Sequence, residues 1–230
     1  MLIRKDSKYE PKTINDIIWG NAESRLRIED IVSGAEALPH CGKSAILLYG
    51  VFGTGKTTLA NLLPNAIEKG RVNEDLAVEA DFIACQQGFN GPQVMSLIER
   101  VLSKTSFNAS GLHYFVLDEV DNLTKLAQQS LKSALNTNRG IFILTTNNIS
   151  ELDKGLKDRC VLVEMNAAKS NQLLPLAHEM ATLMGVDISD DELLPTIKAA
   201  NGSFRNIKHN VERLIRRKNI PNHIIHFDLT

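Results

Sequence analysis

Five short apolar runs recur along the chain up to about residue 165, separated by longer stretches in which apolar residues return every three or four positions. Most of the runs are apolar throughout instead of alternating with polar residues. That pattern is typical of strands covered on both faces in a parallel sheet. The expected strands are Ala45–Tyr49, Val78–Ala84, Leu112–Leu117, Ile141–Leu144 and Cys160–Val163.

The stretches between the runs carry helical periodicity. Pro92–Leu102 and Thr124–Asn136 each place their apolar residues on one face. Pro92 suits the first turn of a helix, because the N–H that proline lacks has no helical partner there. A further helix is expected from about Lys56 to Leu63. Strands that alternate with helices predict a three-layer α/β domain with a five-stranded parallel sheet.

After Glu164 the pattern changes to helices only. Pro175 either kinks the first of these helices or marks its true first turn, because a proline inside a helix removes a hydrogen bond. The pattern predicts a small all-α lid after the α/β domain. The expected helices of the lid are Ser170–Met184, Ser189–Ala200 and Ser203–Lys218.

These patterns divide the chain into an α/β core over residues 1–165, a helical lid over residues 166–218 and a tail over residues 219–230. The tail contains Pro221 and the run H-I-I-H-F at residues 223–227. A frayed terminus is the favoured interpretation of the tail, with a strand or a partner-binding peptide as the alternatives.

Composition and charge narrow the class of protein. The 230 residues are 43% hydrophobic, enough for one sizeable core and a small second domain. Lys and Arg number 26 against 27 Asp and Glu, so any binding of nucleic acid needs a local basic patch or a positively lined assembly. The widely spaced Cys41, Cys85 and Cys160 argue against a disulfide framework or a zinc site, and for a reducing compartment. We found neither a signal-peptide core nor a membrane-length apolar run, so we expect a cytoplasmic protein without membrane contact.

The most informative motif directly follows the first run, where residues 50–57 read G-V-F-G-T-G-K-T. This is the G-x-x-x-x-G-K-[ST] phosphate-binding loop, after a buried strand and before a helix, where its mechanism requires it. The glycines let backbone N–H groups point at phosphate oxygens, Lys56 adds positive charge, and the Thr57 hydroxyl suits Mg²⁺. The start of the following helix presents its positive dipole end to the same anion, so the chain is predicted to bind a nucleoside triphosphate. The expected contacts are Gly53, Thr54, Gly55, Lys56, Thr57 and Thr58.

An acidic pair, Asp118 and Glu119, follows the run Leu112–Leu117. Opposite a phosphate loop, Asp118 is expected to hold Mg²⁺ and Glu119 to polarise the attacking water. An acidic pair after a strand also commonly caps the next helix. The phosphate loop upstream favours the catalytic interpretation.

Three further polar positions are weaker candidates. The run Ile141–Leu144 continues into T-T-N-N. A polar side chain at the tip of this strand would orient water and sense the γ-phosphate. An ordinary turn is the alternative, because Asn favours turns. Arg159 precedes the last strand, and Arg205 lies near the start of the last helix. The planar guanidinium group suits phosphate recognition, whereas isolated arginines are usually solvated surface residues.

The order of these features resembles the AAA+ superfamily, and within it the clamp-loader group typified by the small subunits of replication factor C. Residues 8–18, K-Y-E-P-K-T-I-N-D-I-I, are similar to that group's K-Y-R-P-x-x-x-x-D-I-V box. Residues 118–124 and the helix after them resemble its D-E-A-D segment. The box lines the adenine pocket, so the resemblance implies ATP contacts at Tyr9, Pro11, Ile17 and Ile18.

The resemblance also assigns roles to the weaker candidates. Residues 157–160, K-D-R-C, resemble the S-R-C motif, whose arginine reaches the nucleotide of a neighbouring subunit. This implies a homo- or hetero-oligomer in which Arg159 acts in trans. Residues 185–205 resemble the G-V-x-I … G-D-M-R pattern, which implies that Arg205 is sensor 2. Asn147 takes the place of the polar sensor at the strand tip.

The chain departs from the clamp-loader pattern at four places. Glu10 replaces the arginine of the Y-R-P box, and Asp158 replaces the serine of S-R-C. The segment A-C-Q-Q at residues 84–87 stands where the group has N-A-S-D. Clamp loaders continue beyond the lid into an oligomerising collar, whereas residues 206–230 are all that follow Arg205 here. We therefore expect a clamp-loader-like module without the collar.

The leading hypothesis is an oligomeric ATPase that uses ATP and Mg²⁺ to act on DNA or on a replication protein, as a motor or switch in replication or recombination. A helicase loader or a transposition regulator is a variant of it. The rival is a nucleotide-dependent assembly scaffold with weak ATPase activity. A basic run at the end of the last helix is better explained by the helix dipole than by DNA contact. It comprises Arg213, Arg216, Arg217 and Lys218, and alternative phosphate contacts are Arg100, Lys104, Lys125 and Lys132.

Overall fold

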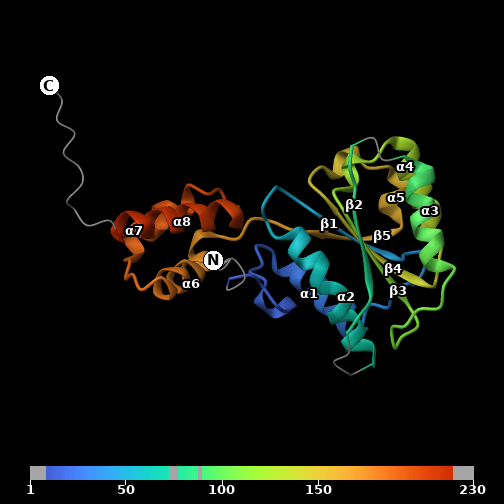
Figure 1. Ribbon diagram of the computed structural model, residues 1–230, viewed down its shortest axis with the longest axis horizontal. Coiled ribbons are helices and arrows are strands. Elements are labelled where there is room, and N and C mark those ends of the chain that lie inside the picture. The colour runs from blue at the N-terminus through green and yellow to red at the C-terminus, as the bar shows by residue number, and fades with distance from the viewer. Residues whose placement is uncertain (1–8, 73–76, 88–89, 220–230) are drawn as a thin grey trace, which may run out of the picture. The chain divides into compact units, whose positions relative to one another are not determined.

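The computed structural model describes residues 9–72, 77–87 and 90–219, which form two compact units (Figure 1). Of the described residues, one unit takes in those within Pro11–Asn166, and the other takes in residues 167–219 with Tyr9 and Glu10. The expected boundary after residue 165 differs from this division by one residue. Tyr9 and Glu10, which we expected in the α/β core, belong to the second unit.

The first unit is built on a five-stranded parallel sheet with strand order β2-β3-β4-β1-β5, which confirms the predicted fold class. Ala45 at the start of β1 lies opposite Phe142 in β4 and Cys160 in β5. Because the strands are parallel, the carboxyl ends of all five lie at the same edge of the sheet. The strands are β1 (Ala45–Tyr49), β2 (Ala80–Ala84), β3 (His113–Asp118), β4 (Gly140–Thr146) and β5 (Cys160–Glu164).

Helices cover both faces of the sheet, which confirms the predicted three layers (Figure 1). On one face, α1 (Ala22–Ser33) and α2 (Lys56–Val72) pack on alternate strand residues such as Ile46. On the other, α3 (Gly91–Leu102), α4 (Lys125–Ala134) and α5 (Lys154–Asp158) pack on the residues between them. Short 3₁₀ turns among the described residues join these elements, namely η2 (Ile14–Asp16), η3 (Val120–Asn122) and η4 (Ile149–Glu151).

The structure differs from the expectation at four elements. The helix after the phosphate loop was expected to end at Leu63, but α2 continues through Pro64 to Val72. Pro64 costs one helical hydrogen bond, and the burial of this face of α2 against the sheet outweighs that loss. The helices α1 and α5 were not predicted. The expectation that both faces are covered is wrong for β2, an edge strand whose Phe82 is 52% exposed.

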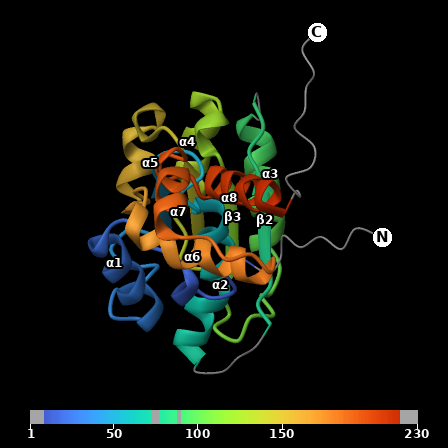
Figure 2. The same ribbon diagram turned by 90° about the vertical axis from the view of Figure 1, so that its left-hand side faces the viewer.

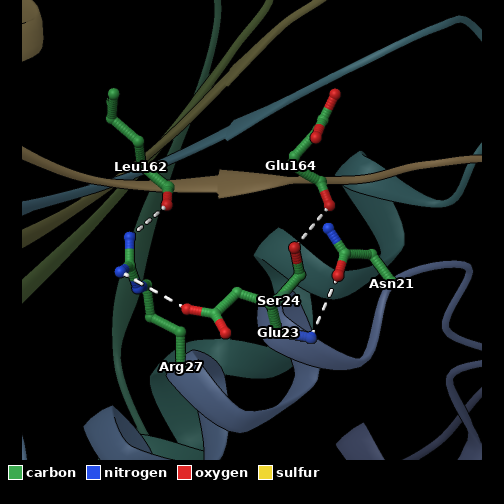
Figure 3. Close-up of polar contacts among 6 residues, drawn as sticks. All are labelled: Asn21, Glu23, Ser24, Arg27, Leu162 and Glu164. Atoms are coloured by element: carbon green, nitrogen blue, oxygen red, sulfur yellow. Dashed lines mark hydrogen bonds and ion pairs between the residues drawn. The ribbon is translucent and has the colours of Figure 1, made fainter.

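The strand β5 forms the opposite edge of the sheet, and side chains of α1 bind its outward carbonyl groups (Figure 3). Ser24 Oγ donates to the carbonyl of Glu164 at 2.7 Å, and Arg27 Nη1 donates to that of Leu162 at 3.1 Å. The side-chain oxygen of Asn21 caps the first turn of α1. These bonds pair backbone groups that an open edge would offer to another chain. They hold β5 beside β1, the strand that leads into the phosphate loop.

A buried carboxylate holds the far end of α2 against β3. Glu68 is 2% exposed. Its oxygens accept hydrogen bonds from Tyr114 Oη at 2.7 Å and from the hydroxyl and amide of Ser110 at 2.6 and 2.7 Å. Burial, together with this carboxylate, raises the pKa of Tyr114. Since α2 begins at the phosphate loop, this cluster fixes the helix that carries the candidate site.

Glu68→Ala is expected to lower the free energy of unfolding by about 2–4 kcal/mol, because the donors of Tyr114 and Ser110 lose their buried acceptor. Chemical denaturation followed by circular dichroism measures the change. Glu99→Ala removes an exposed carboxylate from α3 and serves as the control, with an expected change below about 0.5 kcal/mol. Equal losses in the two variants would contradict the role given to Glu68.

The second unit contains the three predicted helices, α6 (Ser170–Leu183), α7 (Asp190–Lys198) and α8 (Phe204–Asn219), each in contact with the other two (Figure 2). Their buried residues include Ala177, Leu193 and Val211. Pro175 lies inside α6, five residues after its start, so the alternative that it marks the first turn is wrong. The run at residues 223–227, for which a frayed terminus was favoured over a strand or a partner-binding peptide, lies outside the described residues.

Among the residues that the structure describes, we found no helix long and apolar enough to cross a membrane.

Candidate nucleotide-binding site

The phosphate loop connects the carboxyl end of β1 to the first turn of α2, as predicted from the motif. Gly50, Gly53 and Gly55 have φ angles of 147°, 77° and 89°, which side-chain-bearing residues rarely adopt. A Cβ atom at Gly50 would also lie 2.5 Å from the carbonyl oxygen of Met165. The hydroxyl of Thr54 donates to the carbonyl of Val51 at 3.0 Å and closes the turn. The backbone thus requires glycine at these positions.

Lys56 is the first residue of α2, and its side chain folds back into the loop. Its Nζ donates to the carbonyl oxygens of Gly50 at 3.0 Å and Val51 at 2.7 Å, and the residue is 6% exposed. Burial lowers the pKa of Lys56 from its ordinary value. Three nearby carboxylates oppose this shift, those of Asp121, Asp118 and Glu119.

Asp118 and Thr57 lie together at the mouth of the loop. Thr57 Oγ1 donates to Asp118 Oδ1 at 2.9 Å, although the two residues are separated by 61 positions. A hydroxyl and a carboxylate oxygen are hard donors of the kind that Mg²⁺ prefers. The pair that the sequence predicts as metal ligands is therefore brought into contact by the fold, and its chemistry fits Mg²⁺.

Glu119 follows at the end of β3 in a left-handed backbone conformation, with φ 58° and ψ 53°. Its Oε2 accepts a hydrogen bond from Asn122 Nδ2 at 3.2 Å, and its backbone N–H donates to Thr145 Oγ1 at 2.9 Å. Neither Asn122 nor Thr145 was among the predicted site residues. For Thr145 a signal existed, since it lies in the same T-T-N-N segment as Asn147.

Asn147 directly follows β4, which lies between β1 and β3 in the sheet. It therefore lies between the phosphate loop and the acidic pair, where the sensor was expected. The residue is half-buried, and we found no hydrogen bond of its side chain to the described residues. The role of Asn147 as a sensor stays a prediction.

Arg159 lies at the amino ends of the strands, whereas the phosphate loop lies at their carboxyl ends. The next residue, Cys160, pairs with Ala45 at the start of β1, whereas the loop follows Tyr49 at its end. Five residues of strand at about 3.3 Å each place the loop roughly 16 Å from Arg159. Arg159 is thus far from the phosphate loop of its own chain.

The guanidinium group of Arg159 is held by its surroundings. Its Nε donates to Asn136 Oδ1 at 2.9 Å, and its Nη1 donates to the carbonyl of Gly155 at 3.0 Å. The residue is half-buried at the end of α5. These two bonds hold the guanidinium group in one orientation at the amino ends of the strands.

The other predicted contacts are divided between the two units. Ile17 is buried among residues of the α1 and α2 layer, with Pro11 and Ile18 half-buried near it in the chain. Tyr9 belongs to the helical unit, where the Nζ of Lys208 lies 6.0 Å from the centre of its ring. In the same unit, Arg205 is exposed in the first turn of α8, and Thr58 is half-buried in the first turn of α2 in the sheet unit. The roles of these residues in nucleotide binding stay predictions.

A glycine-rich loop, an acidic strand end and a polar strand tip on a five-stranded parallel sheet define a P-loop nucleotide-binding protein. Residues 46–166 match the family model of the ATPase family associated with various cellular activities (AAA). The chain belongs to this family.

The relatives that the chain resembles share names from DNA replication. It is 29% identical over 204 residues to replication factor C small subunit 2 of Pyrobaculum islandicum, covering 86% of this chain and 59% of that protein. It is 26% identical to replication factor C subunit 4 of Saccharomyces cerevisiae, covering 94% of this chain and 64% of that protein. The chain thus spans less than two thirds of the length of these relatives.

The fold is similar to that of a solved structure. The Holliday junction branch migration motor RuvB of Thermotoga maritima superposes with a TM-score of 0.66 at 19% sequence identity. The match covers 90% of this chain and 65% of the RuvB chain. At 19% sequence identity, this similarity shows a shared fold alone.

Proposed function

We propose that this protein is a clamp-loader-like AAA+ ATPase that hydrolyses ATP to ADP and phosphate and acts as an oligomer in DNA replication or recombination. The observation that carries the proposal is the convergence of Lys56, the Thr57–Asp118 pair and Glu119 at one edge of the sheet. A phosphate loop with an acidic strand end is the arrangement that ATP hydrolysis requires. The similarity to replication factor C subunits supports the clamp-loader-like role.

Each residue of the site has a separate task in this proposal. Lys56 and the loop N–H groups bind the phosphates of ATP, and Thr57 and Asp118 hold Mg²⁺, which neutralises charge on the phosphates. Glu119 accepts a proton from the attacking water, and Asn147 orients that water against the γ-phosphate. Thr58 adds a phosphate contact at the start of α2.

The proposal also includes a neighbouring subunit, DNA and the helical unit. Arg159 lies at the far edge of its own sheet, so its guanidinium would complete the site of a second copy or a related chain. We propose that residues 166–218 act as a lid, with Arg205 on the nucleotide, and that Tyr9, Pro11, Ile17 and Ile18 contact adenine. DNA or a replication protein is the proposed partner, in the cytoplasm.

A nucleotide-dependent scaffold with slow turnover is the second candidate. It is favoured by the hydrogen bonds that engage the catalytic groups, because Glu119 is bound by Asn122 and Arg159 by Asn136. These bonds occupy one oxygen of the Glu119 carboxylate and the Nε of Arg159, and they restrain the two groups that hydrolysis would use. The two candidates differ in turnover, not in ATP binding.

Steady-state ATPase rate and particle size, measured together with and without primed DNA, test the proposal. For an assembled ATPase, an ATP analogue enlarges the particle, and the turnover per subunit rises with protein concentration or with DNA. A particle that grows with ATP while turnover stays near zero would favour the scaffold. A monomer whose rate is unaffected by DNA would contradict the proposed function.

Lys56→Ala is expected to abolish nucleotide binding, because it removes the side-chain cation of the phosphate loop. Equilibrium binding of a fluorescent ATP analogue measures the loss. Lys198→Ala, which removes an exposed lysine from α7, is the control and is expected to bind like the wild type. Near wild-type affinity of Lys56→Ala would show that the phosphate-loop assignment is wrong.

A further inference from the structure

The hydroxyl of Thr145 in β4 contacts both members of the acidic pair at the end of β3. Thr145 Oγ1 donates to Asp118 Oδ1 at 2.5 Å and accepts the backbone N–H of Glu119 at 2.9 Å. The residue is 1% exposed, so water does not replace either partner. One buried hydroxyl therefore joins the proposed metal ligand and the proposed base.

The two bonds fix the direction of the hydroxyl proton. An ionised carboxylate is an acceptor only, and a backbone N–H is a donor only. The Thr145 hydroxyl therefore donates to Asp118 and accepts from Glu119. Asp118 Oδ1 also accepts from Thr57 Oγ1 at 2.9 Å, so two hydroxyl groups from different elements orient one carboxylate oxygen. Either bond alone would allow the carboxylate to rotate more freely.

The bond to Glu119 matters because the backbone of Glu119 adopts an uncommon conformation. A φ of 58° is uncommon for a residue other than glycine and is retained only where the surroundings favour it. The N–H of Glu119 binds Thr145, and its carbonyl oxygen accepts the N–H of Asn122 at 3.0 Å. Thr145 thus supports the conformation that aims the Glu119 side chain.

We propose that Thr145 is a positioning residue for ATP hydrolysis, which sets the Asp118 carboxylate and the Glu119 backbone through one shared hydroxyl. This inference rests on the proposed ATPase function. Thr145 touches neither water nor phosphate in the proposal, and it acts through its two neighbours. Because β4 ends at the residue before Asn147, the same strand end would supply both the positioning residue and the sensor.

Two substitutions at Thr145 test the inference. Thr145→Val keeps the shape and removes the hydroxyl, and is expected to lower kcat about 10- to 100-fold while the affinity for a non-hydrolysable ATP analogue stays within about 3-fold. Thr145→Ser keeps the hydroxyl and is expected to restore kcat to within about 3-fold of the wild type. Single-turnover hydrolysis and equilibrium binding supply the two readouts.

The control is a buried hydroxyl at the opposite edge of the sheet. Ser44 is 2% exposed and its Oγ donates to the carbonyl of Leu135 at 2.6 Å, before the start of β1. Ser44→Ala is expected to lower thermal stability without a change in kcat. A kcat loss in Ser44→Ala equal to that in Thr145→Val would reduce Thr145 to a structural role. Thr145→Ser no more active than Thr145→Val would overturn the inference.

Glu119→Gln separates this inference from the function on which it rests. If Glu119→Gln turns over like the wild type, the proposed ATPase mechanism is wrong. If Glu119→Gln is inactive and Thr145→Val has wild-type kcat, only the positioning role is wrong. If the ATPase mechanism and the positioning role are both right, Thr145→Val is expected to lower kcat less in the Glu119→Gln background than in the wild type, because the part of its effect that acts through Glu119 is already lost.

Discussion

Arg159→Ala is expected to lower ATP turnover by about 10³- to 10⁵-fold while leaving ATP bound, because an arginine supplied to the phosphates stabilises the charge of the transition state. The guanidinium group lies at the amino ends of the strands, away from the phosphate loop of its own chain. The loss of turnover is therefore expected at the nucleotide site of a neighbouring subunit. Steady-state ATPase assays over a range of protein concentrations measure the effect. Arg139→Ala is the matched control, since Arg139 is an exposed arginine that precedes β4 at the same sheet edge.

Mixing two inactive variants tests whether Arg159 acts in trans. Arg159→Ala subunits retain Lys56, and Lys56→Ala subunits retain Arg159. Mixed assemblies therefore contain some interfaces with both wild-type residues, and partial recovery of turnover is expected. An unchanged rate in the mixture, together with specific activity independent of concentration, would indicate a monomeric enzyme and contradict the oligomeric mechanism.

Glu119→Gln is expected to reduce turnover by about 10²- to 10⁴-fold and to retain ATP, because the amide keeps the shape of the side chain and cannot accept the proton of the attacking water. The variant is also expected to prolong whatever oligomer ATP promotes. Rapid-quench hydrolysis and light scattering with ATP measure the two effects.

Glu151→Gln supplies the matched control for this substitution. Both glutamates accept a hydrogen bond from the side chain of an asparagine three positions away, Asn122 for Glu119 and Asn148 for Glu151. Wild-type turnover is expected in Glu151→Gln. If Glu119→Gln also hydrolysed ATP at the wild-type rate, the base that accepts the proton of the attacking water would have to be a different residue.

The strands of the sheet were predictable because their signal is local. A strand buried on both faces needs an unbroken apolar run, and β1 has the predicted bounds Ala45–Tyr49. The helix α1 escaped prediction because only two of its apolar residues, Ile28 and Ile31, are buried, so its buried apolar face is narrow. Its position depends instead on polar contacts with β5, such as that of Ser24, which join residues 140 positions apart.

The candidate site was predictable to the extent that its chemistry follows from short motifs. The glycines, Lys56 and Thr57 belong to one loop, and Asp118 and Glu119 end one strand. Thr145 was not predicted, because the T-T-N-N segment marks the tip of the strand but does not show which of its polar side chains contacts the acidic pair. Its two hydrogen bonds exist only because β4 pairs with β3 in a register that places their ends together.

Local sequence was sufficient for five strands, for the helical segments after Glu164 and for the phosphate loop, because backbone conformation and burial there depend on residues a few positions apart. Long-range packing was needed for the rest. The order of the strands exposes β2 at one side of the sheet and brings the Thr145 hydroxyl between Asp118 and Glu119. The parallel pairing of β5 with β1 places Arg159 at the amino ends of the strands, away from the phosphate loop of its own chain. These features depend on which strands lie side by side, and the pairing of strands is set by the packing of the whole sheet between its helices, not by any single segment.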